Sequence, residues 1–154
     1  MIRTNKHGFT LVEILIVVVI LGILAAIVIP QFSNASQEAS VNRIRADLQT
    51  MRSQIELYKI QHLGIAPALG TFKDQMTLQT NVSGATGAAD STLGPYLQSL
   101  PTNAFTMSEN VVAADSATDG WVYTVAAGNI ATVHACNSTN YVPATGQPAT
   151  LDLF

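Results

Sequence analysis

One carboxylate, Glu13, lies inside an otherwise apolar stretch near the start of the chain. Of the 21 residues from Phe9 to Ile29, only Thr10, Glu13 and Gly22 are not apolar. An unpaired charge in apolar surroundings is costly, so this carboxylate needs a cation or hydrogen-bond donors as partners. The chemistry that Glu13 indicates is therefore ion pairing or hydrogen bonding within the apolar stretch.

No other group of residues has the composition of a catalytic centre. His7, His62 and His134 have no metal-ligand spacing to one another, and no nucleophile, base and orienting residue stand together. The glycines lie in polar loops and do not form a phosphate loop after a strand. The lone Cys136 can form no disulfide within the chain, and we expect a half-buried structural residue. We therefore expect no enzyme activity.

The length and charge of the chain restrict its class. A chain of 154 residues fits one domain plus an appendage. Seven Lys plus Arg stand against ten Asp plus Glu, and the only basic cluster is Arg43, Arg45 and Arg52. Nucleic acid is therefore not an expected partner.

The apolar stretch has the length of a membrane span. At about 1.5 Å per residue, a helix over 9–29 matches a hydrocarbon layer of roughly 30 Å. Arg3, Lys6 and His7 precede it, and no acidic residue comes before Glu13. The excess of positive charge places the N-terminus in the cytoplasm and the bulk of the chain on the far side of the membrane.

Two simpler interpretations of this stretch compete. A secretory signal peptide also has a basic start, but its apolar core is shorter than this stretch. Small residues precede the cleavage site of such a peptide, whereas Pro30 and Phe32 follow the apolar stretch of this chain. A plain signal anchor explains the length and the flanks. It does not explain the acid, which carries a cost even near the interface.

A basic leader is followed by Gly8-Phe9-Thr10-Leu11-Val12-Glu13 and then by an apolar helix that reaches Pro30. This arrangement resembles the class III signal of type IV pilins and type II secretion pseudopilins. The resemblance implies that a prepilin peptidase cuts between Gly8 and Phe9 and methylates the new amine of Phe9. It also implies that residues 1–8 are a leader peptide and that 9–29 are a transmembrane and assembly helix.

The implied cleavage supplies a partner for Glu13. The new ammonium group at Phe9 lies one helical turn away, and the pair could form within one helix or between neighbouring subunits. Between staggered parallel helices, the contact would set the axial register. The alternative is a Glu13 at the interface that reaches the lipid headgroups.

Gly22 and Pro30 weaken the same helix. Pro30 lacks an N–H donor and clashes with the preceding turn, so we expect a kink or local loosening there. The family resemblance implies that the segment between Gly22 and Pro30 extends when subunits assemble. The alternative is that both residues are merely tolerated, as is common in membrane helices.

Residues 30–63 continue the helix with an amphipathic pattern. Apolar residues recur at helical spacing, at Val41, Ile44, Leu48, Met51, Ile55 and Tyr58. The charged residues of the other face form the pairs Arg43 with Asp47, Arg52 with Glu56 and Glu56 with Lys59, and we expect a solvated face. The helix should end near Gly64.

Residues 64–154 are predicted to form a globular head. The segment 64–95 is rich in glycine and polar residues and is typical of a loop. The segments 121–125 and 130–134 flank a short Gly-Asn loop and predict a β-hairpin, with Trp121, Tyr123 and Val125 facing the helix. The fold class is therefore α+β: a pilin-like long N-terminal helix whose second half packs on a small antiparallel sheet.

The C-terminal pattern favours one branch of this family. Segments Gly94-Pro95-Tyr96-Leu97 and Gly120-Trp121-Val122-Tyr123 resemble major pseudopilins of type II secretion, and Cys136 alone cannot form the C-terminal disulfide common in type IV pilins. Major pseudopilins often bind calcium in a loop near their C-terminal strands, but this sequence does not clearly match that loop, so we expect no metal or cofactor, with calcium as the alternative. Asp115 and Asp119 offer oxygen ligands, although aspartates also serve turn geometry.

The predicted function is a structural subunit of a helical filament, most naturally the major pseudopilin of a type II secretion system. The alternatives are a type IV pilus subunit for adhesion, motility or DNA uptake, and a membrane-anchored binding domain that does not assemble. The resemblance implies other copies of the chain, prepilin peptidase, an inner-membrane assembly platform, minor pseudopilins and membrane lipid as partners. It implies a location in the bacterial inner membrane, with a periplasmic head and a filament in the periplasm or on the cell surface.

Overall fold

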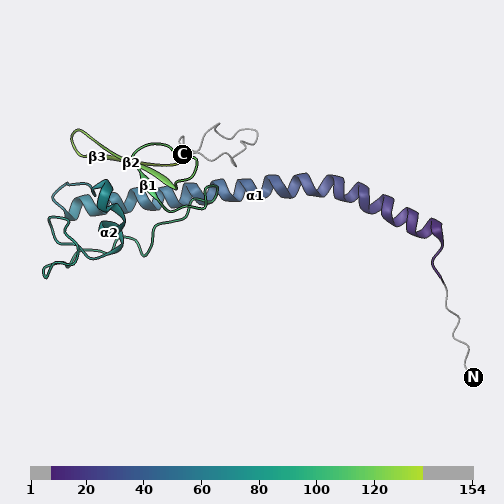
Figure 1. Ribbon diagram of the computed structural model, residues 1–154, viewed down its shortest axis with the longest axis horizontal. Helices are drawn as coiled ribbons and strands as arrows, with labels where there is room; N and C mark the ends of the chain where they lie inside the picture. Colours follow the sequence, from purple (N-terminus) through teal and green to yellow (C-terminus); the bar gives the residue numbers. More distant parts are fainter. Residues whose placement is uncertain (1–7, 137–154) are drawn as a thin grey trace, which may run out of the picture. The chain divides into compact units, whose positions relative to one another are not determined.

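The computed structural model of the chain describes residues 8–136. The chain divides into two compact units, Met1–Ser36 and Gln37–Phe154, and helix α1 (Leu11–Gln61) contributes to both (Figure 1). The predicted leader lies outside the described residues except for Gly8, and residues 137–154 also lie outside them.

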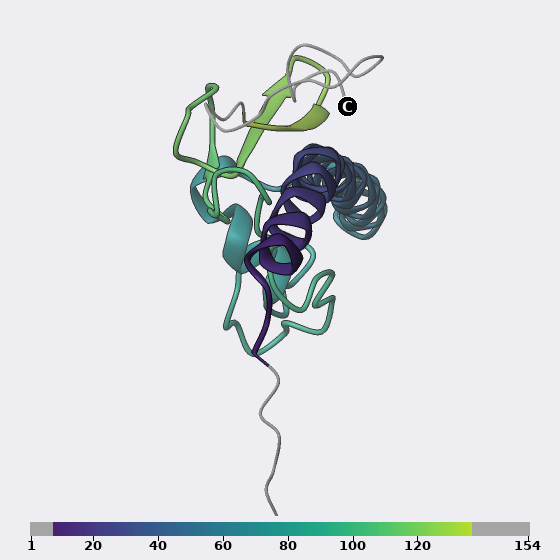
Figure 2. The ribbon, with the colours of Figure 1, turned by 90° about the vertical axis from the view of Figure 1, so that its right-hand side faces the viewer.

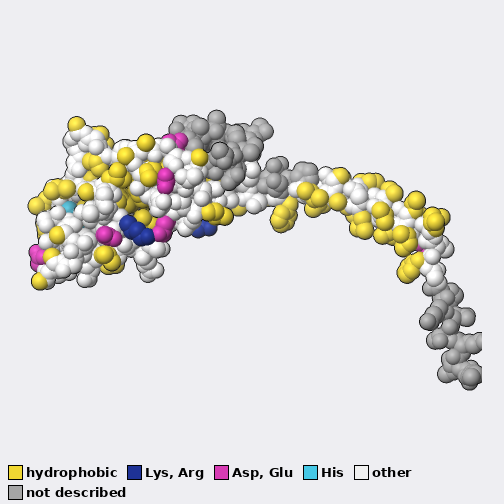
Figure 3. Space-filling model, viewed as in Figure 1, with side chains coloured by type: hydrophobic (Ala, Val, Ile, Leu, Met, Phe, Trp, Pro, Cys, Tyr) yellow, Lys and Arg dark blue, Asp and Glu magenta, His cyan; other side chains and the backbone are white. Residues whose placement is uncertain are grey.

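The first unit consists of the apolar part of α1. Leu11–Ile29 is long and apolar enough to cross a membrane, with a mean hydropathy of 3.3 and none of it buried. Its leucine, isoleucine and valine side chains are half or more exposed, and they dominate this stretch in the space-filling view (Figure 3). A helix that is apolar around its circumference needs an apolar environment, which a bilayer or other apolar helices supply. This agrees with the span that the sequence predicts.

The backbone of α1 is helical through both Gly22 and Pro30. A Cβ at Gly22 would meet no atom within 4 Å, so no neighbour within the chain requires glycine there. Extension between these two residues concerns an assembled state and stays a prediction.

In the second unit, α1 buries the predicted apolar stripe. Each of its six residues is at most 3% exposed: Val41, Ile44, Leu48, Met51, Ile55 and Tyr58. They join one core cluster with Trp121, Tyr123 and Val133 of the sheet. Figures 1 and 2 show the strands and loops of the head gathered around this half of the helix. The amphipathic pattern therefore identified the face of α1 that carries the head.

The end of α1 is held by the tip of the hairpin. The helix ends at Gln61, and the N–H of Gly64 donates to the carbonyl oxygen of Lys59 at 2.7 Å, with Gly64 in the left-handed region at φ 83°. The side chain of Asn129 accepts from the N–H of Ala66 at 3.0 Å and donates to the carbonyl oxygen of Gly64. The predicted end near Gly64 is thus confirmed.

The described residues of the head form a three-stranded mixed sheet in the order β1-β2-β3. Strands β2 (Trp121–Ala126) and β3 (Ile130–Ala135) form the predicted antiparallel hairpin, with Tyr123 opposite Val133. Strand β1 (Val111–Val112) pairs in parallel with β2. The expectation of a purely antiparallel sheet was therefore wrong in β1. A strand of two residues is too short to show any alternation in sequence.

Strand β2 is buried in its first half only. Trp121 and Tyr123 are fully buried, and they donate to the carbonyl oxygens of Pro101 and Pro67, both at 2.7 Å. Val125 is 44% exposed, so the prediction that it faces the helix in the core was wrong. The last three residues of β2 are all exposed, which shows that burial ends before the strand does.

The segment 64–95 contains more structure than the predicted loop. A 3-10 turn η1 (Leu69–Thr71) leads into a short helix α2 (Phe72–Thr77). Phe72 and Met76, four residues apart, are 1% and 0% exposed and belong to the core. One helical turn with two apolar residues gives no periodic signal that separates it from a loop.

The polar face of α1 also differs from the prediction in one residue. The pairs Arg43 with Asp47 and Glu56 with Lys59 form as expected, at 3.7 and 2.9 Å. Arg52, however, donates from Nε and Nη2 to the carbonyl oxygen of Val133, at 3.3 and 3.0 Å. Because β3 is an edge strand within residues 8–136, its outward carbonyl groups need partners, and Arg52 supplies one.

Candidate assembly site

The first turn of α1 is closed by hydrogen bonds between Thr10 and Glu13. One oxygen of Glu13, Oε2, accepts from the backbone N–H of Thr10 at 2.8 Å and from its hydroxyl group at 2.9 Å. The hydroxyl oxygen of Thr10 accepts from the backbone N–H of Glu13 at 3.2 Å. Thr10 precedes the first helical residue, Leu11, so the two side chains satisfy backbone donors at the start of the helix reciprocally.

This arrangement is a capping box, and the sequence reasoning missed it. A Ser or Thr followed three residues later by Glu or Gln, before an apolar run, is the signature of this motif. The pattern Thr10-Leu11-Val12-Glu13 satisfies it. Glu13 therefore has a partner within its own helix before any cleavage takes place, which the ion-pair argument alone did not include.

The predicted cleavage junction lies just before this turn. Gly8 and Phe9 are both exposed, and Phe9 is 84% exposed. A Cβ at Gly8 would meet no atom within 4 Å, so the described part of the chain sets no steric requirement for glycine there. The structure thus places the junction, Phe9 and Glu13 on one short exposed segment.

A shallow apolar hollow follows one side of the same segment. It has a volume of about 690 Å³ and is lined mainly by aliphatic side chains, from Phe9, Thr10, Leu11, Ile14, Leu15, Val18 and Val19. Its residues recur at helical spacing, so they form one face of α1 directly beside the Thr10 to Glu13 cap. An apolar side chain from another helix fits the chemistry of this hollow.

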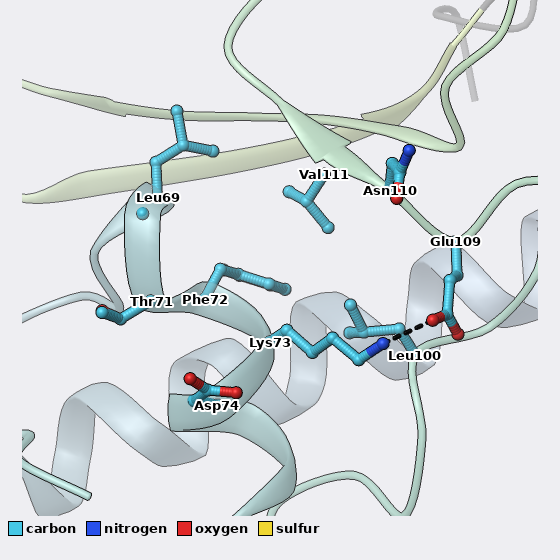
Figure 4. A pocket seen from close by; sticks show the side chains of 10 residues that line it. Leu69, Thr71, Phe72, Lys73, Asp74, Leu100, Glu109, Asn110 and Val111 are labelled. Carbon is cyan, nitrogen blue, oxygen red and sulfur yellow. Dashed lines mark hydrogen bonds and ion pairs between the residues drawn. The ribbon is translucent and has the colours of Figure 1, made fainter.

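A second hollow lies in the head between α2 and the approach to β1 (Figure 4). It measures about 220 Å³, and Phe72, Leu100 and Val111 line it. Lys73 and Glu109 form an ion pair across its rim. The pair joins a helix to a loop 36 residues later. Asp74 also lines this opening, so one carboxylate there lies outside the pair.

Asp115 and Asp119 lie in the turn before β2. Asp115 accepts from the N–H of Ser116 at 2.9 Å, and Asp119 accepts from the side chain of Asn110 at 3.2 Å. Among the described residues, no three His, Cys, Asp or Glu side chains gather where they could hold a metal ion. Each carboxylate has a role in turn geometry, and calcium binding stays an untested alternative.

His62 and Cys136 are parts of the interior of the head. His62 is 1% exposed, stacks on the ring of Tyr58 at 3.7 Å, and lies 2.9 Å from the hydroxyl group of Thr80. Cys136 is fully buried, not half-buried as expected, and burial raises the pKa of its thiol to about 11. His62 and Cys136 are thus surrounded by the packed head.

Comparison with known proteins gives the N-terminal region an independent assignment. Residues 3–29 match the prokaryotic N-terminal methylation motif. The chain is 42% identical over 60 residues to the type II secretion system core protein G of Pseudomonas aeruginosa, an alignment that covers 39% of this chain and 42% of the relative. It is 46% identical over 54 residues to a type IV major fimbrial protein of Dichelobacter nodosus, which covers 35% of each.

A longer match extends beyond the apolar helix. The chain is 30% identical over 118 residues to the type IV major pilin protein PilE1 of Neisseria gonorrhoeae, which covers 77% of this chain and 47% of the pilin. The chain thus spans less than half of the length of these curated relatives. No solved structure matches significantly.

The fold and the site define a class: an α+β protein with an exposed apolar N-terminal helix, a capped acid in its first turn, and a small head on its second half. The methylation motif over residues 3–29 and the matched relatives support a pilin-like protein, similar to type IV pilins and to the type II secretion system core protein G.

Proposed function

We propose that this chain is the major pseudopilin of a type II secretion system: a structural subunit that is processed between Gly8 and Phe9 and then assembles into a helical filament. The observation that carries the proposal is the Glu13 carboxylate, held in the first turn of a helix whose apolar surface is wholly exposed. Several relatives named type II secretion system core protein G support the choice within the family.

Processing starts with hydrolysis of the peptide bond between Gly8 and Phe9 by a prepilin peptidase, and methyl transfer to the new amine follows. The exposed junction suits access by an enzyme. Because the chain itself sets no steric requirement at Gly8, a preference for glycine there is expected to come from the peptidase. Cleavage removes Arg3 and Lys6 and leaves the acidic excess larger.

Assembly then changes the partner of Glu13. In the uncleaved chain its Oε2 atom is occupied by the two donors of Thr10. Cleavage creates a cation at Phe9, next to Thr10 in sequence. In a bundle of staggered helices, the carboxylate of one subunit and the amine of its neighbour neutralise each other, and this contact sets the register. Burial of the apolar faces of α1 supplies the affinity.

The location and the partners follow from this assembly. The N-terminus lies in the cytoplasm and the head in the periplasm, as the basic leader indicates. The subunit waits in the inner membrane among lipids until an assembly platform extracts it, and minor pseudopilins join the same filament. Gly22 and Pro30 permit α1 to extend during this transfer.

Three variants separate the charge of Glu13 from its capping role. Glu13→Gln keeps an acceptor suited to the capping box but removes the charge. Thr10→Val removes the hydroxyl group of the cap but keeps the charge and the shape. Glu13→Leu removes both functions. Membrane insertion, processing and filament formation are measured for each, by fractionation, mass spectrometry and electron microscopy.

If the charge sets the register, Glu13→Gln and Glu13→Leu insert into the membrane but form no filaments, whereas Thr10→Val still assembles. Normal filaments from Glu13→Gln would refute the ion-pair argument and leave capping as the role of Glu13. An unprocessed chain in its native host would refute the pseudopilin proposal itself.

A type IV pilus subunit is the second candidate. The match to the gonococcal pilin favours it, since 118 aligned residues cannot be confined to the apolar helix and must include the head. Deletion of the gene distinguishes the two. Loss of exported enzymes from the medium supports secretion, and loss of surface pili with normal export supports the pilus.

A further inference from the structure

The methionines of this chain differ sharply in their surroundings. The sequence has four, of which Met1 lies outside the described residues. Met51 and Met76 are 0% exposed and belong to the core of the head. Met107 is 78% exposed. Its thioether is therefore open to reagents in solvent, while those of Met51 and Met76 are not.

Met107 projects from a turn that the buried side chain of Asn103 holds in place. The backbone N–H of Met107 donates to the carbonyl oxygen of Asn103 at 2.9 Å, and the N–H of Asn103 donates to the carbonyl oxygen of Ser108, also at 2.9 Å. Asn103 is fully buried and donates from Nδ2 to the carbonyl oxygen of Gly120 at 2.9 Å. The turn is thus closed by the backbone and anchored to the sheet.

The turn also packs too closely on the sheet to shift easily. A Cβ at Gly120 would overlap the carbonyl group of Ser108, so the two backbones touch. Met107 has a φ of 56°, in the left-handed region, which keeps its side chain at the tip of this turn. The exposure of Met107 is therefore a consequence of a tightly bonded turn and does not depend on fraying.

The side chain of Met107 has no part in holding the turn. The hydrogen bonds that close it come from the backbone of Met107 and from Asn103. A chemical change at the sulfur atom should therefore leave the fold intact. In Met51 or Met76 the same change would put a polar group into the core, which is strongly destabilising.

We propose that Met107 is a site of reversible oxidation to methionine sulfoxide by hydrogen peroxide. A lone pair of the thioether sulfur attacks one peroxide oxygen, an S–O bond forms, and the O–O bond breaks. The second oxygen leaves as hydroxide and takes the proton of the newly sulfur-bound hydroxyl group, so that the products are the sulfoxide and water. The sulfur loses two electrons and the peroxide gains them. The inference concerns the head alone and stands independently of the proposed filament function.

Oxidation at this position converts an exposed apolar tip into a polar one without unfolding the head. The product is accessible to a methionine sulfoxide reductase, because the turn presents it to solvent. The head would thus carry a reversible change of surface polarity at one defined point.

The test treats the full-length protein in detergent micelles with hydrogen peroxide and locates the added oxygen by tandem mass spectrometry. Fragmentation is needed because no Lys or Arg follows Lys73, so one tryptic peptide contains both Met76 and Met107. Met107 should gain oxygen at least about tenfold faster than Met51 and Met76, which react only when the head opens. The fluorescence of Trp121 should stay unchanged, and the reductase should remove the oxygen.

Two controls keep the test decisive. In denaturant, all three methionines should react at similar rates, which shows that folding causes the selectivity. In the Met107→Leu variant, the folded head should gain no oxygen over the same time. Equal rates at Met107 and Met76 in the folded protein would overturn the proposal. So would loss of the native Trp121 signal on oxidation of Met107 alone, or a sulfoxide that the reductase cannot remove.

Discussion

Replacing Asn103 by alanine should lower the free energy of unfolding of the head by about 3 kcal/mol. The buried amide group donates to the carbonyl oxygens of Gly120 and Cys136, at 2.9 and 3.3 Å, and accepts from the N–H groups of Phe105 and Thr106, at 2.9 and 3.5 Å. Alanine removes all four bonds. The N–H of Phe105 is left buried and unsatisfied, at a cost of about 2 kcal/mol. The carbonyl oxygen of Gly120 keeps its bond from the N–H of Cys136 but loses the one from Asn103, at a cost of about 1 kcal/mol.

The single tryptophan makes this loss measurable. Trp121 is fully buried and donates to the carbonyl oxygen of Pro101, beside the affected turn. Urea unfolding of the full-length protein in micelles, followed by tryptophan fluorescence, should show the midpoint falling by about 2 M for an m-value of about 1.5 kcal/mol/M.

Asn110→Ala is the matched control for this experiment. Its side chain makes an exposed bond to Asp119, so its loss should cost less than about 0.5 kcal/mol. An Asn103→Ala variant within about 1 kcal/mol of the parent would refute the role assigned to the buried amide. Equal losses in the two variants would refute it as well.

Three further predictions concern the head. Burial raises the pKa of the Cys136 thiol to about 11 from an ordinary 9.0, so alkylation at pH 8 should be at least about 100-fold slower in the folded head than in the unfolded chain, and equal alkylation rates would contradict this prediction. The stability that the head gains from the neutral thiol is present below pH 9 and should fall as the pH rises to 11. Arg52→Lys should cost about 1 kcal/mol, because lysine cannot repeat the two bonds to the carbonyl oxygen of Val133, and an unchanged urea midpoint would refute that contribution. Calorimetric titration with calcium tests the calcium alternative: binding heat that disappears in an Asp115→Asn, Asp119→Asn double variant supports a site there, and no heat in the parent rejects it.

The parts of the fold that follow from sequence are those with long periodic patterns. The stripe from Val41 to Tyr58 repeats over five intervals of three or four residues, and all of it is buried. The hairpin was predictable because β-branched and aromatic residues flank a loop in which Gly128 and Asn129 adopt positive φ angles. Local chemistry and periodicity suffice for these elements.

The missed parts depend on contacts between residues far apart in the chain. Asn103 is a buried polar residue because its partners, Gly120 and Cys136, lie 17 and 33 residues later. Arg52, which was expected on the solvated face, donates to the carbonyl oxygen of Val133, 81 residues later. No local sequence pattern predicts such contacts, since Asn and Arg side chains are most often exposed.

The candidate site is different, since its signal was local and available. Thr10 and Glu13 are three residues apart at the start of an apolar run. In the uncleaved chain, the capping box gives the Glu13 carboxylate its hydrogen-bond donors without a second chain. The ion pair with Phe9 concerns the cleaved chain. Glu13 caps its own helix in the described chain, and we propose that it pairs with an amine after processing.

The most direct test of this account is the mass of the mature N-terminus. Protein purified from the membranes of its native host is analysed intact and after proteolysis by mass spectrometry. We expect a chain that begins at Phe9 and carries one methyl group on its amine. An intact leader, or a cut near Pro30 that removes the apolar helix, would contradict it.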